Sequence, residues 1–472
     1  MVILAVDCYR GNRKYPGACT VSGDAGRHPS KEVAMRHLRG VLAGAVSMIA
    51  LATTGTSAQQ PPSAISGAQK LMIVPASKYP GHVYVLPATL ETTQWGWFDN
   101  AELPRLVIES GDTVVVETMS HSHGQLWPGS TIEQLKKLRT DWPGRGPMSL
   151  TGPIFVKDAE PGDSLRIKIQ KIVPRSWAAN FNIPGMFGQF PKDFPEGQVK
   201  YFYLDADRKI AEFAPGIEIP LRPFPGTLGV ARAEPGRYNA VPPGPFAGNL
   251  DNRDLIEGTT LHVPVFVRGA LVWTGDSHAA QGNGEINLTA LETAFQEIVL
   301  TITVDKAARL RWPRIETPTE WITMGFDEDL TVALANAKSE TARLLAEQRN
   351  ISPEQALALV STTSDCRVTQ VVDIKKGVHC ISSKDPSRSL AAPLPTTETA
   401  DSLVTYAGNA DLNKAMDTAS WNMIELLQKQ KALSRLDAYS LASMTMDCRV
   451  GEMNAPEKGV HCLVAKSLWV KR

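Results

Sequence analysis

The C-terminal part of the chain contains the same sequence unit twice. Asp365-Cys-Arg-Val recurs as Asp447-Cys-Arg-Val, and Lys376-Gly-Val-His-Cys recurs as Lys458-Gly-Val-His-Cys. Both motifs repeat at one offset of 82 residues (447 − 365 and 458 − 376), so the copies match without a gap. Because a duplicated sequence is expected to fold as a duplicated structure, whatever fold one copy adopts should occur twice.

Each copy has the pattern of two helices followed by a β-hairpin. In the first copy, apolar residues at helical spacing run from Leu330 to Leu345, and Ser352-Pro-Glu-Gln is a capping box with proline at the first helical position. Residues 366–373 and 377–381 then alternate around a polar turn, as paired strands do. The pattern predicts a duplicated helix-helix-hairpin unit of the α+β kind.

Residues 1–58 are expected to lie outside the fold. Met35 to Gly40 is a basic segment, Val41 to Ala52 is an apolar run, and Thr56-Ser-Ala precedes Gln59. This is the pattern of a secretory signal peptide that starts at Met35 and is cleaved near 58/59, with an upstream stretch before it that is not native. A membrane anchor is the alternative, but the apolar run is shorter than the ~20 residues a span needs. The prediction is a periplasmic or secreted protein without a stable membrane span.

Export changes the interpretation of the cysteines. The mature chain keeps an even number of them, and an oxidising compartment permits disulfides: Cys366, Cys380, Cys448 and Cys462. Of the three connectivities, one bridge within each copy is preferred because it closes a short loop. The alternative is a pair of Cys/His metal sites that use His379 and His461. Adjacent residues of a strand point to opposite faces, which disfavours it.

The rest of the chain is predicted to be mainly β. Gly111-Asp-Thr-Val and Gly162-Asp-Ser-Leu are turns that lead into alternating strands, which suggests a β-sandwich or barrel-like core. The expected organisation is a β-rich catalytic domain at 59–310, an α+β unit at 311–385, a linker at 386–399 and the second copy at 400–472. The formal net charge of +0 offers no footprint for nucleic acid and suits a small neutral substrate.

The stretch from Trp273 to Glu292 carries the densest set of reactive side chains. An apolar run from Leu261 to Trp273 predicts a buried strand that delivers Asp276 and His278 onto a turn at its end. Glu285 follows between glycines, and 297–304 alternates as a return strand. Carboxylates and an imidazole on one loop are typical of a metal or acid–base site.

Several motifs together resemble the acetamidase/formamidase family in order and spacing: Leu150-Thr-Gly-Pro, Gly226-Thr-Leu-Gly-Val-Ala, Gly248-Asn-Leu-Asp-Asn-Arg-Asp-Leu, Gly275 to Glu285 and Thr289-Ala-Leu-Glu. The resemblance covers about residues 70–385, and 365–373 fits the family pattern Asp-Leu-Arg-Ile-Ser-Gln-Val-Val-Asp. It implies a mainly β fold with an α+β C-terminal part and hydrolysis of a short aliphatic amide to ammonia and a carboxylate. Family members tend to be oligomeric, so the resemblance also implies a homo-oligomer.

Two positions depart from the family pattern. The family commonly has Asp at Asn283 and a Cys-Gly pair at Asn287-Leu288. A thiol nucleophile is therefore absent at this point, and a cation site that used Asn283 as a ligand would be weakened.

Water is the expected nucleophile. The chain has no Gly-x-Ser-x-Gly motif, and the cysteines of the mature chain all lie in the repeats. A metal can polarise an amide carbonyl and acidify water, and Asp251, Asp276 and His278 form a mixed oxygen and nitrogen set that Zn²⁺ accepts. Ca²⁺ or Mn²⁺ would suit a version richer in carboxylates.

Glu285 is predicted to be the general base and later the acid for the leaving ammonia, acting with the catalytic Asp276 and His278. Asn249 and Gln125 are predicted to hold the substrate amide, with His123 as a further ligand or oxyanion donor.

Structural alternatives remain for each of these residues. Asp276 and His278 could pin a turn, Asp251 could cap one, and Glu285 could pair with Arg253. His121 and His123 could be inert loop histidines.

Three functions stay open at this point. They are a secreted metal-dependent amidase, a periplasmic metal- or small-molecule-binding protein on the same fold without turnover, and a hydrolase of another C–N bond.

Overall fold

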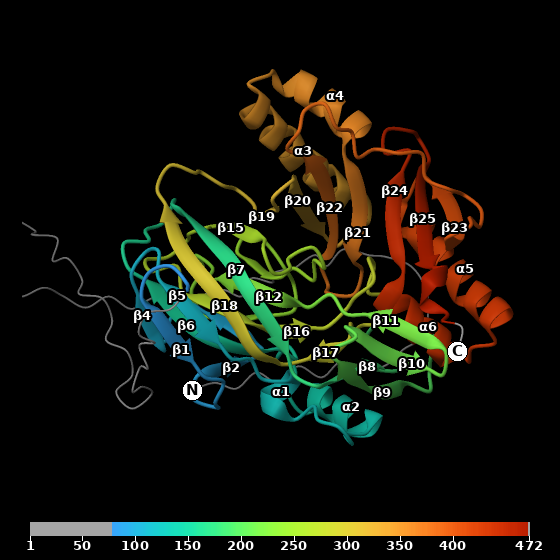
Figure 1. Cartoon of the computed structure of the whole chain (residues 1–472), viewed down its shortest axis with the longest axis horizontal. Helices are drawn as coiled ribbons and strands as arrows, with labels where there is room; N and C mark the ends of the chain where they lie inside the picture. The colour runs from blue at the N-terminus through green and yellow to red at the C-terminus, as the bar shows by residue number, and fades with distance from the viewer. Residues whose placement is uncertain (1–77, 471–472) are drawn as a thin grey trace, which may run out of the picture. The chain divides into compact units, whose positions relative to one another are not determined.

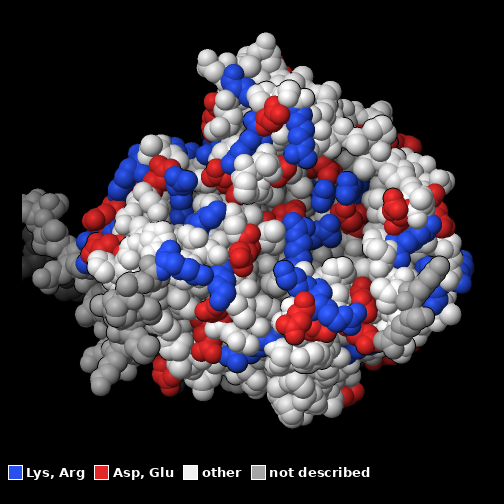
Figure 2. All heavy atoms as spheres, in the orientation of Figure 1, with Lys and Arg blue, Asp and Glu red and all other residues white. Residues whose placement is uncertain are grey.

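The computed structural model describes residues 78–470 (Figure 1). The predicted signal peptide and its cleavage point lie outside the described residues. No helix between residues 78 and 470 is long and apolar enough to cross a membrane. On the face shown in Figure 2, basic and acidic side chains are intermixed.

One long sheet passes through the N-terminal part and both copies of the duplicated unit (Figure 1). The order of its strands is β1 (Val83–Leu86), β5 (Thr113–Val116), β18 (Phe295–Asp305), β7 (Ser164–Pro174), β15 (Thr260–Pro264), β19 (Arg314–Glu316), β20 (Glu320–Asp327), β22 (Lys376–Ser383), β21 (Asp365–Gln370), β24 (Asp447–Gly451), β25 (Lys458–Ala465) and β23 (Ser402–Asn409). The two copies therefore continue a sheet that begins with strands from the N-terminal part of the described chain.

A second sheet lies against the first. Its main path is β11 (Ile217–Pro220), β10 (Ile210–Ala214), β9 (Gln198–Asp205), β8 (Trp177–Asn182), β17 (Glu292–Thr293), β16 (Val272–His278), β12 (Phe224–Val230) and β14 (Ala247–Asn249). Three further strands lie off this path: β6 (Ser149–Val156) pairs with β16, and β2 (Thr93–Trp95) and β4 (Leu106–Ile108) pair with β6. A separate pair joins β3 (Trp97–Asp99) to β13 (Arg237–Asn239).

Apolar side chains of both sheets form one core. Leu261 of β15 and Ile298 of β18 belong to the same buried cluster as Leu150 of β6 and Trp273 of β16. Each of these four side chains is fully buried, so their apolar surface holds the sheets together. The prediction of a mainly β protein with an α+β C-terminal part is confirmed.

The helices begin at capping residues that the sequence displays. They are α1 (His121–Gly124), α2 (Ile132–Thr140), α3 (Leu330–Arg349), α4 (Pro353–Thr363), α5 (Leu412–Lys431) and α6 (Arg435–Thr445), with a 3₁₀ turn at Lys466–Leu468. Capping boxes at Thr131 and Ser352 start α2 and α4, and the Asp329 and Asp411 side chains accept hydrogen bonds from the first turns of α3 and α5.

Each copy of the duplicated unit also contains a strand before its helices, which the sequence motifs do not mark. The first copy runs β20, α3, α4, β21, β22 and the second runs β23, α5, α6, β24, β25. Adding 82 to the bounds of β20 gives those of β23 (320 + 82 = 402; 327 + 82 = 409). The copies meet where β21 and β24 pair antiparallel, with Arg367 opposite Arg449.

The preferred disulfide connectivity is confirmed. Cys366 is bonded to Cys380 and Cys448 to Cys462, and each pair faces across the hairpin of its own copy. His379 lies on β22 beside Cys380. Its ring Nδ1 shares a hydrogen bond with Thr369 Oγ1 at 2.8 Å, and Cys380 is in a disulfide, so the two do not form a Cys/His metal site.

The predicted strand from Leu261 to Trp273 is wrong in its extent. Residues of this run belong to two strands of different sheets, β15 and β16, and a turn at Gly269 separates them. β16 then continues through His278. Asp276 and His278 therefore lie on the strand itself, whereas the predicted return strand falls within β18.

Candidate active site

Asp276 and His278 are two residues apart near the end of β16. Residues at this spacing on a strand share a face, although the left-handed φ of 50° at Asp276 shows that the strand is distorted there. Both side chains are buried. Gly226 of β12 lies beside them, and a Cβ atom at this position would lie 2.6 Å from Asp251 Oδ1 and 2.6 Å from His278 Cε1. Only glycine leaves room for the group.

Five further side chains converge on this pair from distant parts of the chain. They are His121 of the α1 turn, Asp251 after β14, Glu285 in the segment after β16, Glu292 of β17 and Asp373 after β21 of the first copy. All are buried. Asp251 and Glu285 have φ values of 46° and 50°, a strained conformation that the surrounding structure must impose.

The two imidazoles lie between the carboxylates. His121 Nε2 is 2.7 Å from Asp276 Oδ1 and 3.0 Å from Glu292 Oε2. His278 Nε2 is 3.2 Å from Glu292 Oε2, and its Nδ1 is 3.7 Å from Asp251 Oδ1. The cluster therefore contains five carboxyl groups and two imidazoles in direct or near contact.

The predicted ligand set comes together. Asp251, Asp276 and His278 each offer a ligand atom, and these atoms lie within 4.8 Å of one another. Three other trios satisfy the same distance: His121 with Asp276 and Glu292, His278 with Glu285 and Glu292, and Asp251 with Glu285 and Asp373. The first and last of these share no residue, so the cluster has room for more than one cation.

The donor atoms fit a cation. Asp251 Oδ1, Glu285 Oε2 and Asp373 Oδ2 are buried and have no hydrogen-bond partner within the described part of the chain. Buried carboxylate oxygens without donors are costly, and a hard or borderline divalent cation would satisfy them.

Without a metal, burial and mutual repulsion oppose ionisation of three of the acids. Burial and the charge of Asp276 raise the pKa of Asp251 to about 7. Burial and the charge of Asp251 raise the pKa of Glu285 well above its usual value. The same two causes raise the pKa of Asp373 well above its usual value. For His278, the carboxylates of Glu292 and Asp276 outweigh burial and raise the pKa of the imidazole. Strongly perturbed groups in one cavity are typical of a catalytic site.

His123 and Gln125 do not join the site. The α1 turn places Ser122 and His123 in left-handed conformations, with φ of 56° and 54°, so His121 and His123 do not share a face as strand residues would. The His123 ring lies 5.7 Å from the Trp95 ring, and Gln125 is exposed, with its Nε2 donating to the Ser122 carbonyl. Neither residue lines the cavity, so the roles in substrate binding predicted for them stay predictions without support from this geometry.

Asn249 lies in the cavity, but both ends of its amide are occupied. Its Oδ1 accepts from Thr227 Oγ1 at 2.6 Å, and its Nδ2 donates to Asp251 Oδ2 at 2.7 Å. Asn249 therefore orients Asp251, and its second amide N–H has no partner among the described residues, so the predicted contact with the substrate amide stays a prediction.

The contacts resolve one structural alternative and one departure from the family pattern. Arg253 pairs with Asp447 at 3.3 Å and not with Glu285. Asn283 is not part of the cluster, because its Nδ2 donates to Asp447 Oδ1 at 2.6 Å. The absence of a carboxylate at Asn283 thus removes no ligand.

Sequence reasoning missed three members of the cluster. Glu292 and Asp373 end two of the segments that carry the family resemblance, Thr289-Ala-Leu-Glu and 365–373, and this was the available signal. His121 was weighed only together with His123. No local pattern brings the three together, because β17, the α1 turn and the first copy meet only in the folded chain.

The cluster lines a cavity of about 130 Å³. The remaining wall is apolar and aromatic, with two basic residues: Trp142, Met148, Phe181, Phe187, Leu288, Arg139 and Arg145. A small molecule in this cavity would contact acids on one side and apolar or cationic groups on the other.

The chain is similar to proteins of one family. The profile described as the acetamidase/formamidase family matches residues 95–237 and 232–384. A Schizosaccharomyces pombe protein that carries the name formamidase is 26% identical over 250 residues, which are 40% of this chain and 58% of that protein. An acetamidase of Mycolicibacterium smegmatis is 28% identical over 197 residues, 29% of this chain and 48% of that protein. The chain thus spans about half the length of these two relatives.

A solved structure is also similar. The crystal structure of an acetamidase from Bacillus halodurans matches with a TM-score of 0.57 and 29% sequence identity, over 63% of this chain and 97% of that one.

Proposed function

The chain belongs to the acetamidase/formamidase family, and we propose on that basis that it hydrolyses a short aliphatic amide to ammonia and a carboxylate. One observation supports this most directly: buried acids without hydrogen-bond donors and two imidazoles line a small cavity. Water is the proposed nucleophile, since all four cysteines of the described residues are in disulfides.

Asp251, Asp276 and His278 are the proposed metal ligands, and His121, Glu292 and Asp373 are additional candidates. A divalent cation held there, zinc or alternatively calcium, supplies Lewis acidity towards the amide carbonyl and the attacking water. Asn249 and Thr227 orient Asp251 and so fix one side of the ligand set.

Glu285 is the proposed general base. Its Oε2 is buried and has no hydrogen-bond partner among the described residues, and its raised pKa suits a group that takes a proton from water and returns it to the leaving amine. The surrounding apolar wall of Phe181 and Leu288 limits the access of further water.

Export to the periplasm or the medium is part of the proposal, and the two disulfides support it, because such bonds persist in oxidising compartments. The homo-oligomer remains a prediction.

The test is ammonia release from formamide and acetamide by the wild type and by Glu285→Gln. We expect the variant to lose at least about a hundredfold in kcat, since a general base contributes roughly 10²–10⁴-fold. Full activity in the variant would remove Glu285 from this role. Bound metal without ammonia release from any amide would support the alternative of a binding protein.

A further inference from the structure

The segment that carries Glu285 is held from both sides by the second copy of the duplicated unit. Ser443 of α6 contacts it three times: its carbonyl accepts from Gly282 N at 2.9 Å, its Oγ accepts from Asn287 N at 3.1 Å, and the same Oγ donates to the Thr289 carbonyl at 2.9 Å. Ser443 therefore contacts residues before and after Glu285 in the sequence.

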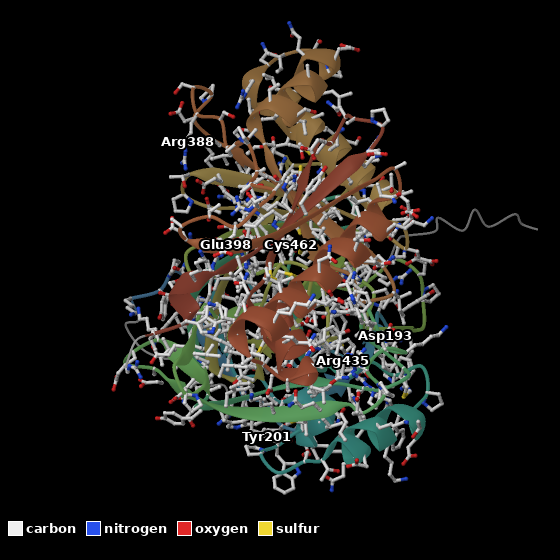
Figure 3. All side chains as sticks on the ribbon, turned by 90° about the vertical axis from the view of Figure 1, so that its right-hand side faces the viewer. Asp193, Tyr201, Arg388, Glu398, Arg435 and Cys462 are labelled. Atoms are coloured by element: carbon white, nitrogen blue, oxygen red, sulfur yellow. A yellow bond between two sulfur atoms is a disulfide. The ribbon has the colours of Figure 1, made fainter. Side chains whose placement is uncertain are left out.

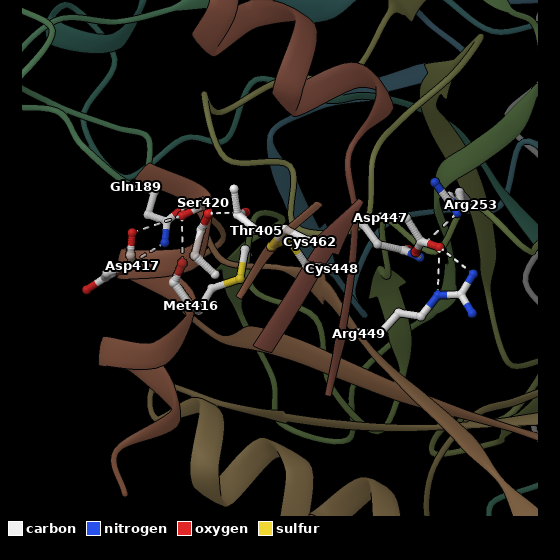
Figure 4. Close-up of a disulfide and its surroundings, with 12 residues drawn as sticks. Gln189, Arg253, Thr405, Met416, Asp417, Ser420, Asp447, Cys448, Arg449 and Cys462 are labelled. Atoms are coloured by element: carbon white, nitrogen blue, oxygen red, sulfur yellow. Dashed lines mark hydrogen bonds and ion pairs between the residues drawn. A yellow bond between two sulfur atoms is a disulfide. The ribbon is translucent and has the colours of Figure 1, made fainter. Parts of the chain in front are cut away.

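Further contacts come from Tyr439 and from the start of β24. The Tyr439 hydroxyl donates to the Ile286 carbonyl at 2.7 Å. Cys448 N donates to the Asn283 carbonyl at 3.2 Å, and Asp447 holds the Asn283 side chain. Asp447 is itself held by Arg449 at 2.8 Å (Figure 4).

The second copy is firmly attached next to this segment. The Arg435 guanidinium, labelled in Figure 3, lies 4.6 Å from the centre of the Phe194 ring. Lys200 Nζ donates to Asp437 at 2.9 Å. Gly282 leaves no space either, because a Cβ atom there would lie 2.6 Å from the Met446 carbonyl oxygen. α6 and β24 therefore form a rigid surface against 282–289.

Glu285 needs such support. Its φ of 50° is costly for a residue with a side chain and persists only where neighbouring contacts impose it. Among the described residues, the backbone hydrogen bonds from the first copy to this segment both go to Gly284, through Thr369 and Val371, whereas the second copy bonds to residues on both sides of Glu285. The family profile ends at residue 384, so the contacts of Ser443 and Tyr439 come from beyond the matched region.

We propose that the second copy acts as a built-in clamp on the catalytic segment, with Ser443 and Tyr439 as positioning residues for Glu285. The inference rests on the proposed function. It assigns to the appended copy a role in the reaction rather than in stability alone.

The chain offers a matched control. Ser361 occupies in α4 the position that Ser443 occupies in α6 (443 − 361 = 82), and its hydroxyl contacts Asn454 instead of the catalytic segment. Ser443→Ala and Ser361→Ala thus make the same change at equivalent places.

We expect Ser443→Ala to lower kcat by about tenfold or more while KM stays within about threefold, because small misplacements of a reacting group are costly. Amide hydrogen exchange within 282–289 should accelerate in Ser443→Ala and not in Ser361→Ala. Tyr439→Phe, which keeps the ring, should act in the same direction and serves if Ser443→Ala does not fold.

Equal kcat in wild type, Ser443→Ala and Tyr439→Phe would overturn the clamp, as would an equal loss in Ser361→Ala. If the wild type releases ammonia from no amide, the proposed function fails, and hydrogen exchange alone then decides whether the second copy holds the segment.

A different observation concerns the substrate. Arg139 and Arg145 line the same cavity. Within residues 78–470 neither guanidinium has an acceptor at hydrogen-bond or ion-pair distance, although the charges of Asp276 and Glu292 act on Arg139 from farther away. Arg139 lies 5.8 Å from the Phe187 ring centre, and Arg145 lies 4.7 Å from that of Trp95 and 5.0 Å from that of Trp142. Unpaired guanidinium groups in a cavity are suited to bind a carboxylate.

We infer that the substrate is an amide that also carries a negatively charged group, with Arg139 as its contact. This inference also rests on the proposed function, and it places the amide at the acidic cluster and the negative charge at Arg139. The probes are succinamate and butyramide, which differ in one terminal carboxylate.

We expect the wild type to have the higher kcat/KM for succinamate, and Arg139→Gln to lower that value about tenfold more than it lowers the value for butyramide. Lys136→Gln makes the same charge change on an exposed position of α2 and should alter neither value. No preference in the wild type, or a parallel loss for both amides, would overturn the inference. Absence of turnover with both amides and with acetamide would instead refute the proposed function.

Discussion

Gly226 faces the most crowded part of the acidic cluster, and this makes it a direct probe of the site. In Gly226→Ala the new methyl group would lie 2.6 Å from Asp251 Oδ1 and from His278 Cε1. We expect weaker metal binding and a loss of about a hundredfold or more in kcat/KM, because the ligands must move by about 1 Å. Gly236→Ala is the control for space, since nothing lies within 4 Å of a Cβ there; its φ of 106° adds backbone strain that Gly226→Ala does not have. Equal effects of the two substitutions would contradict this account of Gly226.

Leu288 has a backbone conformation that is unusual for a residue with a side chain. Its φ of 108° lies in a region that favours glycine, and its side chain lines the cavity. Leu288→Gly should raise kcat/KM for a bulkier amide such as benzamide relative to acetamide by about tenfold, since the pocket loses a large apolar group. Unchanged relative specificity would show that Leu288 does not limit the substrate.

The sequence alone identifies four of the seven residues of the cluster. Asp251, Asp276, His278 and Glu285 were predicted because they lie in two short motifs dense in reactive side chains. Glu292 and Asp373 end segments that resemble the family, but nothing in those segments says that they reach the cavity, and the neighbours of His121 give no signal at all. The left-handed turn at Ser122 also could not be read from the sequence, and it decides that His121 enters the site while His123 does not.

Among the elements, β24 depends on the ionised form of Asp447. Burial raises the pKa of this carboxyl group, but Arg253, Arg367 and Arg449 outweigh burial and lower the pKa well below its usual range. The stabilisation is therefore present above the unfolded pKa of about 4 and is lost as the pH falls towards the folded value. Asp447→Asn should cost about 3 kcal/mol of unfolding free energy at pH 7 and progressively less below pH ~4, measured by urea titration. A difference independent of pH would contradict the ionic account.

The hairpin disulfides allow the two copies to be compared. Each bridge spans a sequence separation of 14 residues, so chain entropy predicts about 3 kcal/mol for either bond. Cys366→Ala/Cys380→Ala and Cys448→Ala/Cys462→Ala should therefore lose similar stability in denaturant titrations. Only the second pair should also lower kcat, because β24 touches the catalytic segment through Cys448. An equal effect on kcat would argue against that connection.

The elements of the duplicated unit were largely predictable, because capping residues and a gapless repeat mark them. β20 and β23 were not, since each precedes the first helix and pairs with the hairpin of its copy only in the folded sheet. The division of the run from Leu261 to Trp273 between two sheets was hidden for a related reason: an apolar sequence does not say which sheet it enters.

In the whole molecule, the duplication extends a sheet and completes a site. β21 would be an edge strand without the second copy, and pairing with β24 covers that edge. The same pairing brings α6 against the segment of Glu285. Sequence motifs show that the second copy exists, but its contact with the catalytic segment depends on which strands pair, and this is a property of the complete fold.

The most direct test of the central claim is the metal content of the mature protein, purified in metal-free buffer, together with ammonia release from short amides and from succinamate before and after chelation. The account predicts at least about one equivalent of a divalent cation per chain, loss of ammonia release on chelation and recovery when the cation is restored. Full ammonia release from protein without metal would contradict it. Something other than a cation would then have to satisfy the buried acids around His278 and activate the attacking water.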